Sequence, residues 1–243
     1  MLLSLLSGSS LQDIIIQLLL LMPIILFSLS LHETAHGFVA YKCGDPTAHN
    51  LGRLSLNPLR HLDPIGFLMM LLVGYGWAKP VPVNTRYFRN PKRGMALTAA
   101  AGPLSNLLLG LICTVLLAFF YVLFDRVKHN PEVTQMTLQL INYLCNVFSL
   151  SAYINFVFAF FNLIPLPPFD GSRIALLFLP QKYYFKIMRY ERQIMFGLLI
   201  ALFALSYAFD FSPTGFLADR LIGWIGNPLC DLFAKLLLSK YMA

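Results

Sequence analysis

The residues most able to do chemistry lie in one short run, residues 31–37, which reads Leu-His-Glu-Thr-Ala-His-Gly. His32 and His36 are four positions apart, so on a helix both side chains project from one face, with Glu33 beside them. Two imidazoles at this spacing can hold a zinc ion, and the intervening glutamate can take a proton from zinc-bound water. The pattern predicts a hydrolytic metal site with His32 and His36 as ligands and Glu33 as the catalytic residue.

The setting of this motif is unusual, because it completes a long apolar run that begins at Ile14. Of the 243 residues, 58% are hydrophobic and 12% are charged, which is about half the usual charged share of a soluble domain. Polar side chains within such runs face a bundle interior or a wet cavity. We therefore expect one integral membrane domain over residues 1–243, with its hydrolytic site inside the membrane.

The apolar runs predict an all-α polytopic membrane protein with about four to six transmembrane helices. The expected spans cover residues 14–39, 94–124, 138–164 and 194–209. Residues 42–93 are rich in Pro, Gly and Asn, and we expect short strands or extended loops there. Within them, residues 65–73 are apolar but too few to span as a helix, so a re-entrant or interfacial segment is expected. Residues 14–175 form the expected catalytic core, and residues 176–243 the C-terminal helices, with amphipathic or interfacial helices over 216–238.

The distribution of charged residues predicts how the chain is oriented in the membrane. Five cations follow one another with no acid between them: Lys79, Arg86, Arg89, Lys92 and Arg93. An excess of Lys and Arg marks cytoplasmic loops, so the first and third spans both run inward. The net charge of +7 fits this orientation and contact with anionic lipid better than nucleic-acid binding. The first 13 residues lack the basic stretch of a cleaved signal peptide, and the four scattered cysteines indicate neither a zinc site nor a disulfide framework.

A third ligand is expected at the end of the third span. Residues 162–171 read Asn-Leu-Ile-Pro-Leu-Pro-Pro-Phe-Asp-Gly, and three prolines in four residues cannot continue a helix. Open backbone at membrane depth is tolerated where it lines a watery cavity. A carboxylate is an acceptable zinc ligand beside two histidines, so Asp170 is the best candidate, with the fourth position left for water. The alternative is that Asp170 only caps the helix that follows.

The second span carries small or polar residues at four-residue spacing, namely Gly94, Thr98, Gly102, Asn106 and Gly110. Such a stripe allows close helix packing in lipid. Pro103 is expected to interrupt this helix next to Asn106. The Asn106 amide is suited to a hydrogen bond between helices or to contact with substrate, and the sequence leaves both open.

Three motifs together resemble the site-2 protease family of intramembrane zinc metalloproteases. They are His32-Glu33-Thr34-Ala35-His36, Gly102-Pro103-Leu104-Ser105-Asn106 and Asn162-x-x-Pro165-x-Pro167-x-x-Asp170-Gly171, in that order within residues 14–175. The resemblance implies one zinc ion per chain held by His32, His36 and Asp170, with Glu33 as acid and base. It also implies cleavage within or near a substrate's membrane segment, and places Asn106 and Asn162 near the active site, where they would contact substrate. The chain looks like a minimal form without a PDZ domain.

Other functions use the same residue types. A membrane zinc transporter or metal-binding membrane protein is the main alternative, although internal repeats are lacking and Glu33 would have no obvious role in transport. An inactive scaffold that binds membrane helices is a third. Expected partners are transmembrane protein or peptide substrates and the lipid bilayer, while the oligomeric state is not indicated. We expect a prokaryotic cytoplasmic (inner) membrane, an active site toward the cytoplasm, and strand addition of the unwound substrate to an edge within residues 50–90.

Overall fold

The computed structural model describes residues 11–73, 76–175, 177–178, 180, 183, 189–208, 220, 223–224 and 227–239. Within them the only regular elements are helices, as predicted. Of the short strands or extended loops expected in residues 42–93, the described residues there form loops and short helices, and no strand. A single isolated antiparallel bridge, between Leu62 and Ala78, is the only described β-pairing. Turn chemistry explains the difference. Asn57 and Asn84 each accept a hydrogen bond from the backbone N–H two residues on, which starts a short 3-10 turn instead of an extended ladder.

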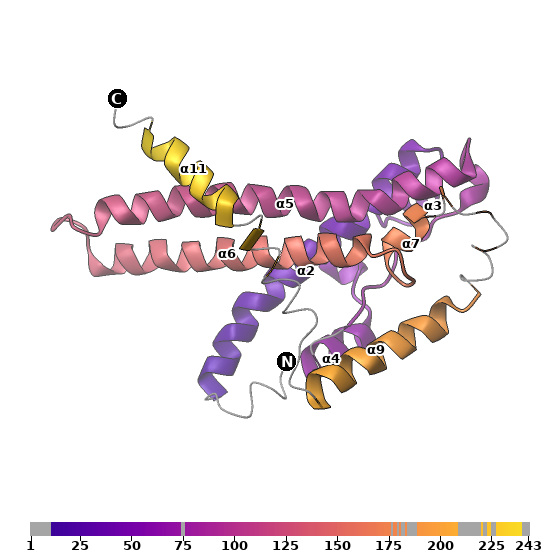
Figure 1. The fold of residues 1–243 in the computed structure, drawn as a ribbon, viewed down its shortest axis with the longest axis horizontal. Coiled ribbons are helices and arrows are strands. Elements are labelled where there is room, and N and C mark those ends of the chain that lie inside the picture. The colour runs from indigo at the N-terminus through magenta and orange to yellow at the C-terminus, as the bar shows by residue number, and fades with distance from the viewer. Residues whose placement is uncertain are drawn as a thin grey trace. The chain divides into compact units, whose positions relative to one another are not determined.

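Three described helices are long and apolar enough to cross a membrane: α2 (Leu11–Lys42), α5 (Pro91–Val127) and α6 (Gln135–Leu163) (Figure 1). They confirm the first three expected spans. Both α2 and α5 continue through an internal proline, so the expected interruption at Pro103 is wrong. The fourth expected span corresponds to α9 (Glu191–Ala208), which is a helix but not one of these three, and residue 209 lies outside the described residues.

Short elements connect α2 to α5. They are α3 (Thr47–Asn50), η1 (Pro58–Arg60), α4 (Pro64–Val73) and η2 (Thr85–Tyr87). The apolar helix α4 has 10 residues, hence a length of about 15 Å, or half the hydrocarbon thickness of a bilayer. It is too short to cross as a helix, as the sequence predicted for residues 65–73.

The proline-rich break after the third span is confirmed. Helix α6 ends at Leu163, and α7 (Asp170–Ala175) begins after a turn that contains a cis Pro167–Pro168 bond. Near the C-terminus, α11 (Asn227–Ser239) carries polar residues four apart at 227, 231 and 235, which gives it the amphipathic character predicted there. Most of residues 216–226 lie outside the described part of the chain.

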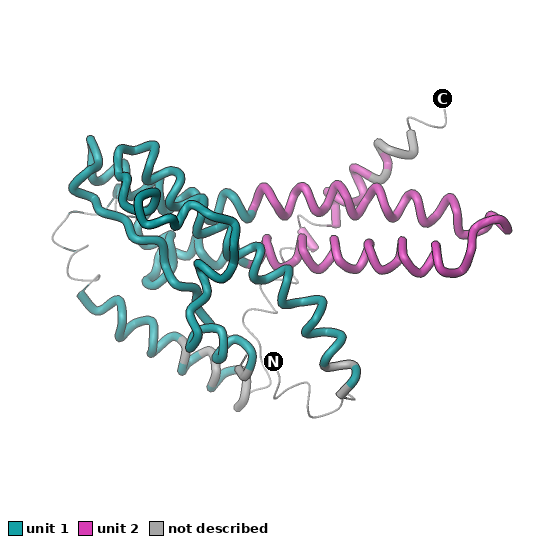
Figure 2. The backbone as a smooth tube through the Cα atoms, turned by 180° about the vertical axis from the view of Figure 1, so that it is seen from behind, with its two compact units in different colours: residues 1–106, 158–213 teal, residues 107–157, 214–243 magenta. Residues whose placement is uncertain are grey.

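The chain forms two compact units, residues 1–106 with 158–213 and residues 107–157 with 214–243 (Figure 2). Helices α5 and α6 each pass from one unit into the other. In the second unit, the remainders of these two helices form an antiparallel hairpin in which the Phe120 and Phe148 rings stack with their centroids 5.4 Å apart. A single domain over residues 1–243 stays a prediction. All residues of the site described next belong to the first unit.

Candidate metal centre

Three predicted ligands come together in the first unit. His32 and His36 lie one turn apart on α2, and Asp170 is the first residue of α7. The Asp170 Oδ2 atom lies 3.1 Å from Nε2 of His32 and 3.1 Å from Nε2 of His36, and the two Nε2 atoms are 3.0 Å apart. All three side chains are buried. The structure thus joins residues that the sequence separates by 138 positions.

Both imidazoles are oriented by acceptors on their other ring nitrogen. His32 Nδ1 lies 2.5 Å from the Asn106 side-chain oxygen, and His36 Nδ1 lies 2.7 Å from the Thr98 carbonyl oxygen. A nitrogen that faces an acceptor must carry the hydrogen, so in each neutral ring Nε2 presents its lone pair. Two lone pairs and a carboxylate oxygen then converge within about 3 Å. Such a set of acceptors needs a cation or a shared proton between them.

The donor set fits a zinc ion. Zinc takes imidazole nitrogen and carboxylate oxygen, and a ligand histidine ordinarily donates its other N–H to a backbone carbonyl or side-chain oxygen. When a shared proton rather than a cation joins these atoms, an Nε2–H donates to the Asp170 carboxylate. Burial then raises the pKa of Asp170, but the hydrogen bonds and charges of His32 and His36 outweigh burial and hold that pKa below its ordinary value. Among the described hydrogen bonds, none joins the Asp170 carboxylate to the backbone of α7, so the capping alternative has no support.

Gly102 allows α5 to lie directly against the two imidazoles. A Cβ atom at this position would lie 2.5 Å from His36 Cε1 and 2.6 Å from His32 Cε1. Thr98 and Asn106, one turn to either side of Gly102, supply the two acceptors on the rings. The close packing predicted for this stripe of α5 is confirmed, and at Gly102 the stripe packs against the side chains of His32 and His36. Sequence reasoning missed that partner.

A second glycine fixes the start of α7. A Cβ atom on Gly171 would lie 2.2 Å from the Leu163 carbonyl oxygen, in the last turn of α6. Helix α7 therefore begins in direct contact with the end of α6, with Asp170 as its first residue. Ser172 reinforces the turn by donating to the Phe169 carbonyl at 2.7 Å. The proline break and this glycine together bring the carboxylate to the histidines.

Glu33 lies next to the ligands and is held from outside its own helix. Its Oε2 atom accepts a hydrogen bond of 2.8 Å from the backbone N–H of Val81. The sequence identified Glu33 as the catalytic residue but not its partner. Every residue except proline carries a backbone N–H, so the type of the residue 48 positions away does not indicate this hydrogen bond.

The two predicted substrate-contact asparagines differ in placement. Asn106 is fully buried (0% exposed), and it orients His32 and also donates to the Ser28 carbonyl at 3.3 Å. Asn162 donates to the Phe158 carbonyl of its own helix at 2.9 Å. No described hydrogen bond joins Asn162 to the three ligands. Asn106 thus has a defined role behind a ligand, and substrate contact by either residue stays a prediction.

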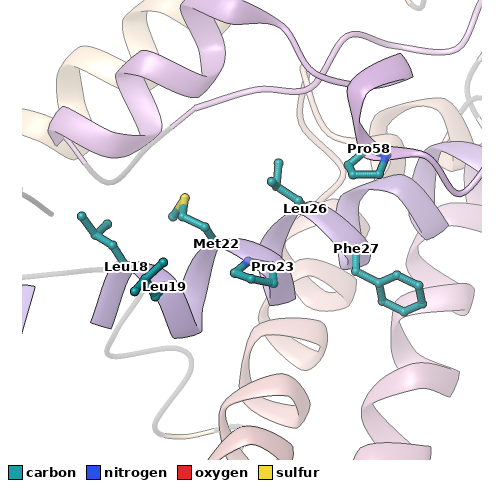
Figure 3. Close-up of a pocket in the computed structure, with 7 residues that line it drawn as sticks. All are labelled: Leu18, Leu19, Met22, Pro23, Leu26, Phe27 and Pro58. Atoms are coloured by element: carbon teal, nitrogen blue, oxygen red, sulfur yellow. The ribbon is translucent and has the colours of Figure 1, made fainter. Parts of the chain in front are cut away.

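An apolar pocket of about 510 Å³ lies along the N-terminal half of α2 (Figure 3), and none of the three ligands lines it. It is lined by Leu18, Leu19, Met22, Pro23, Leu26, Phe27 and Pro58. From Leu26 the same helix face continues at intervals of three and four residues through Leu29 to Glu33. The apolar side chains that line the pocket and the candidate base Glu33 therefore lie on one face of α2.

The geometry defines a class of protein, namely a membrane protein with a buried His-His-Asp metal centre and an adjacent glutamate. Comparison with known proteins narrows this class. Residues 20–204 match Peptidase family M50, the site-2 protease family, and the chain belongs to it. The resemblance carried by the three motifs is thereby confirmed.

Two relatives support the assignment. Over 150 residues the chain is 43% identical to "Putative zinc metalloprotease YwhC" of Bacillus subtilis (strain 168), covering 62% of this chain and 64% of that protein. Over 152 residues it is 30% identical to "Putative zinc metalloprotease Rip2" of Mycobacterium tuberculosis (strain ATCC 25618 / H37Rv), covering 60% and 52%. The chain thus spans less than two thirds of the length of each relative. No solved structure matches it significantly.

Proposed function

We propose that this chain is an intramembrane zinc metalloprotease that hydrolyses peptide bonds in or near the transmembrane segments of other membrane proteins. One observation carries the proposal: two imidazole nitrogens and a carboxylate oxygen converge beside Glu33, on a helix long and apolar enough to cross a membrane. Membership in Peptidase family M50 and the names of the two relatives support it.

Each residue then has a role in hydrolysis. His32, His36 and Asp170 would hold one zinc ion, which when bound polarises the scissile carbonyl and makes water more acidic. Glu33 takes the proton of the attacking water and passes it to the leaving amine. The Val81 N–H fixes one oxygen of the Glu33 carboxylate, and Asn106 keeps His32 in the tautomer that a metal ligand needs.

A membrane-embedded substrate is consistent with the surroundings of Glu33. The apolar row that leads along α2 to this residue suits the apolar side chains of a membrane segment. A substrate helix must open locally before its peptide bond can react, because helical hydrogen bonds shield the backbone. Strand addition within residues 50–90 stays a prediction. At residues 79–81 several backbone groups are already bonded within the chain, so the pairing edge would lie elsewhere in that range.

We place the protein in a prokaryotic cytoplasmic membrane with its site toward the cytoplasm. Exposed cations gather in residues 79–93, which contain the segment bonded to Glu33: Lys79, Arg86, Arg89 and Arg93 are exposed there. A cationic surface of this kind favours the cytoplasmic side. A reporter fused within residues 86–93 should be accessible only from the cytoplasm, and labelling from outside would overturn the orientation.

The Glu33→Gln variant tests the function. The variant should still bind about one zinc ion, measured by elemental analysis, and should trap a membrane protein that the wild type cleaves in liposomes. Cleavage should fall roughly 10²- to 10⁴-fold because the proton acceptor is lost. Retained cleavage would refute the mechanism, and zinc flux that Glu33→Gln leaves unchanged would favour the transporter.

A further inference from the structure

The segment Lys79–Asn84 supplies the only described hydrogen bond to the Glu33 carboxylate. Its Val81 side chain is 8% exposed and packs one turn along α2 from Glu33, where a Cβ atom on Gly37 would lie 3.1 Å from Val81 Cγ1. The backbone N–H of Val81 donates to Glu33 Oε2 at 2.8 Å. The orientation of Glu33 therefore depends on where residue 81 is held.

Asp45 ties this segment to the end of α2. Its carboxylate is fully buried (0% exposed), and Oδ2 accepts the backbone N–H of Asn84 at 2.6 Å. The other oxygen accepts the backbone N–H of Thr47 at 3.0 Å and also its hydroxyl. A buried charge is costly unless it is fully hydrogen-bonded, and these bonds satisfy it. The backbone of Asp45 is itself fixed by donating to the Ala40 carbonyl at 3.0 Å.

Arg53 ties the segment on the other side of Val81. Its Nη2 atom donates to the Lys79 carbonyl at 2.8 Å and to the Pro80 carbonyl at 3.3 Å, immediately before Val81. The Lys79 N–H donates in turn to the His61 carbonyl at 2.8 Å. Residue 81 thus lies between two charged anchors, neither of which belongs to the metal centre.

We propose that Asp45 and Arg53 are positioning residues for the catalytic base. They hold residues 79–84 from both sides, so that the Val81 N–H fixes one oxygen of Glu33 and leaves the other to accept the proton of water. The inference rests on the proposed function, because it takes Glu33 to be the base. Loss of either anchor lowers kcat, while zinc content and KM stay near those of the wild type.

Hydrogen exchange tests the link without any substrate. In full-length protein loaded with zinc, the Val81 amide should exchange at least about tenfold faster in Glu33→Ala than in the wild type, whereas the Asn84 amide, which is bonded to Asp45, should keep its protection. Glu33→Gln should keep the protection, because its amide oxygen still accepts from Val81. Unchanged exchange in Glu33→Ala would overturn the proposal. This result does not depend on proteolysis, so a wild type that cleaves nothing would refute the proposed function alone.

Kinetics then test the anchors. In Asp45→Ala, kcat should fall about 10- to 100-fold with KM within about twofold, since small misplacements of a catalytic group are costly. Asp45→Asn, which keeps an acceptor for Asn84, should recover part of the loss. Asp63→Ala is the matched control, because this carboxylate accepts the Gly66 N–H at 2.8 Å and no described hydrogen bond joins it to residues 79–84. A changed KM with unchanged kcat, or loss of zinc in Asp45→Asn, would contradict the proposal.

Discussion

The Gly102→Ala substitution distinguishes a role of Gly102 beside the metal ligands from a role in helix packing alone. The new Cβ atom would lie 2.5 Å from His36 Cε1 and Nε2, whereas ordinary contacts begin at 3.4 Å, so the rings or α5 must move by about 0.9 Å. The rings cannot turn freely, because each Nδ1 is bonded to a group on α5 itself. Overpacking of this kind costs about 1–3 kcal/mol, and displaced ligands lower metal affinity about 10- to 100-fold.

The matched control is Gly110→Ala, two turns along the same stripe. Its Cβ atom would lie 2.8 Å from Phe156 Cε1, a comparable clash that involves no ligand. Zinc affinity is measured by competition with a chelator, and folding by thermal unfolding in detergent. Both variants should be destabilised, but only Gly102→Ala should lose zinc affinity. Wild-type zinc affinity in Gly102→Ala, or an equal loss in Gly110→Ala, would refute the reasoning.

Two further substitutions examine how the ligands are held. Asn106→Ala removes the acceptor on His32 Nδ1 and should lower zinc affinity about 10- to 100-fold in the same chelator competition, and an unchanged affinity would contradict the assigned tautomer. Gly171→Ala brings a Cβ atom to 2.2 Å from the Leu163 carbonyl oxygen, where only backbone movement can relieve the clash, so Asp170 should shift and zinc should be lost. Full zinc content by elemental analysis in Gly171→Ala would argue against the tight turn.

Much of the site could be predicted because its signals are local. His32, Glu33 and His36 follow helical spacing, and Asp170 follows a run of prolines that must open the backbone. The apolar runs located three spans because the bilayer requires long apolar helices. For residues 42–93 the sequence left short strands and extended loops open, because short alternating pieces such as residues 53–56 fit the two-residue period of a strand. The structure has loops and short helices there, since the turn chemistry of Asn and Pro decides the local structure.

The groups that orient the site could not be read from residue type alone. Thr98 and Val81 act through backbone atoms, which every residue carries. Asn106 did leave a signal, since it shares a four-residue stripe with Gly102. Helices α2 and α5 run antiparallel, so that position 106 meets 32 while position 98 meets 36. With that register known, the stripe on α5 would have been predicted to orient the two ligand histidines.

Anomalous scattering at the zinc edge from crystals of the purified protein would locate the metal ion itself. We expect one zinc ion per chain, bound by Nε2 of His32, Nε2 of His36 and the Asp170 carboxylate. Asp170→Ala should lose most of the zinc, while Glu33→Gln should keep it. A zinc ion bound without Asp170, or full zinc content in Asp170→Ala, would show that the His-His-Asp centre is wrong.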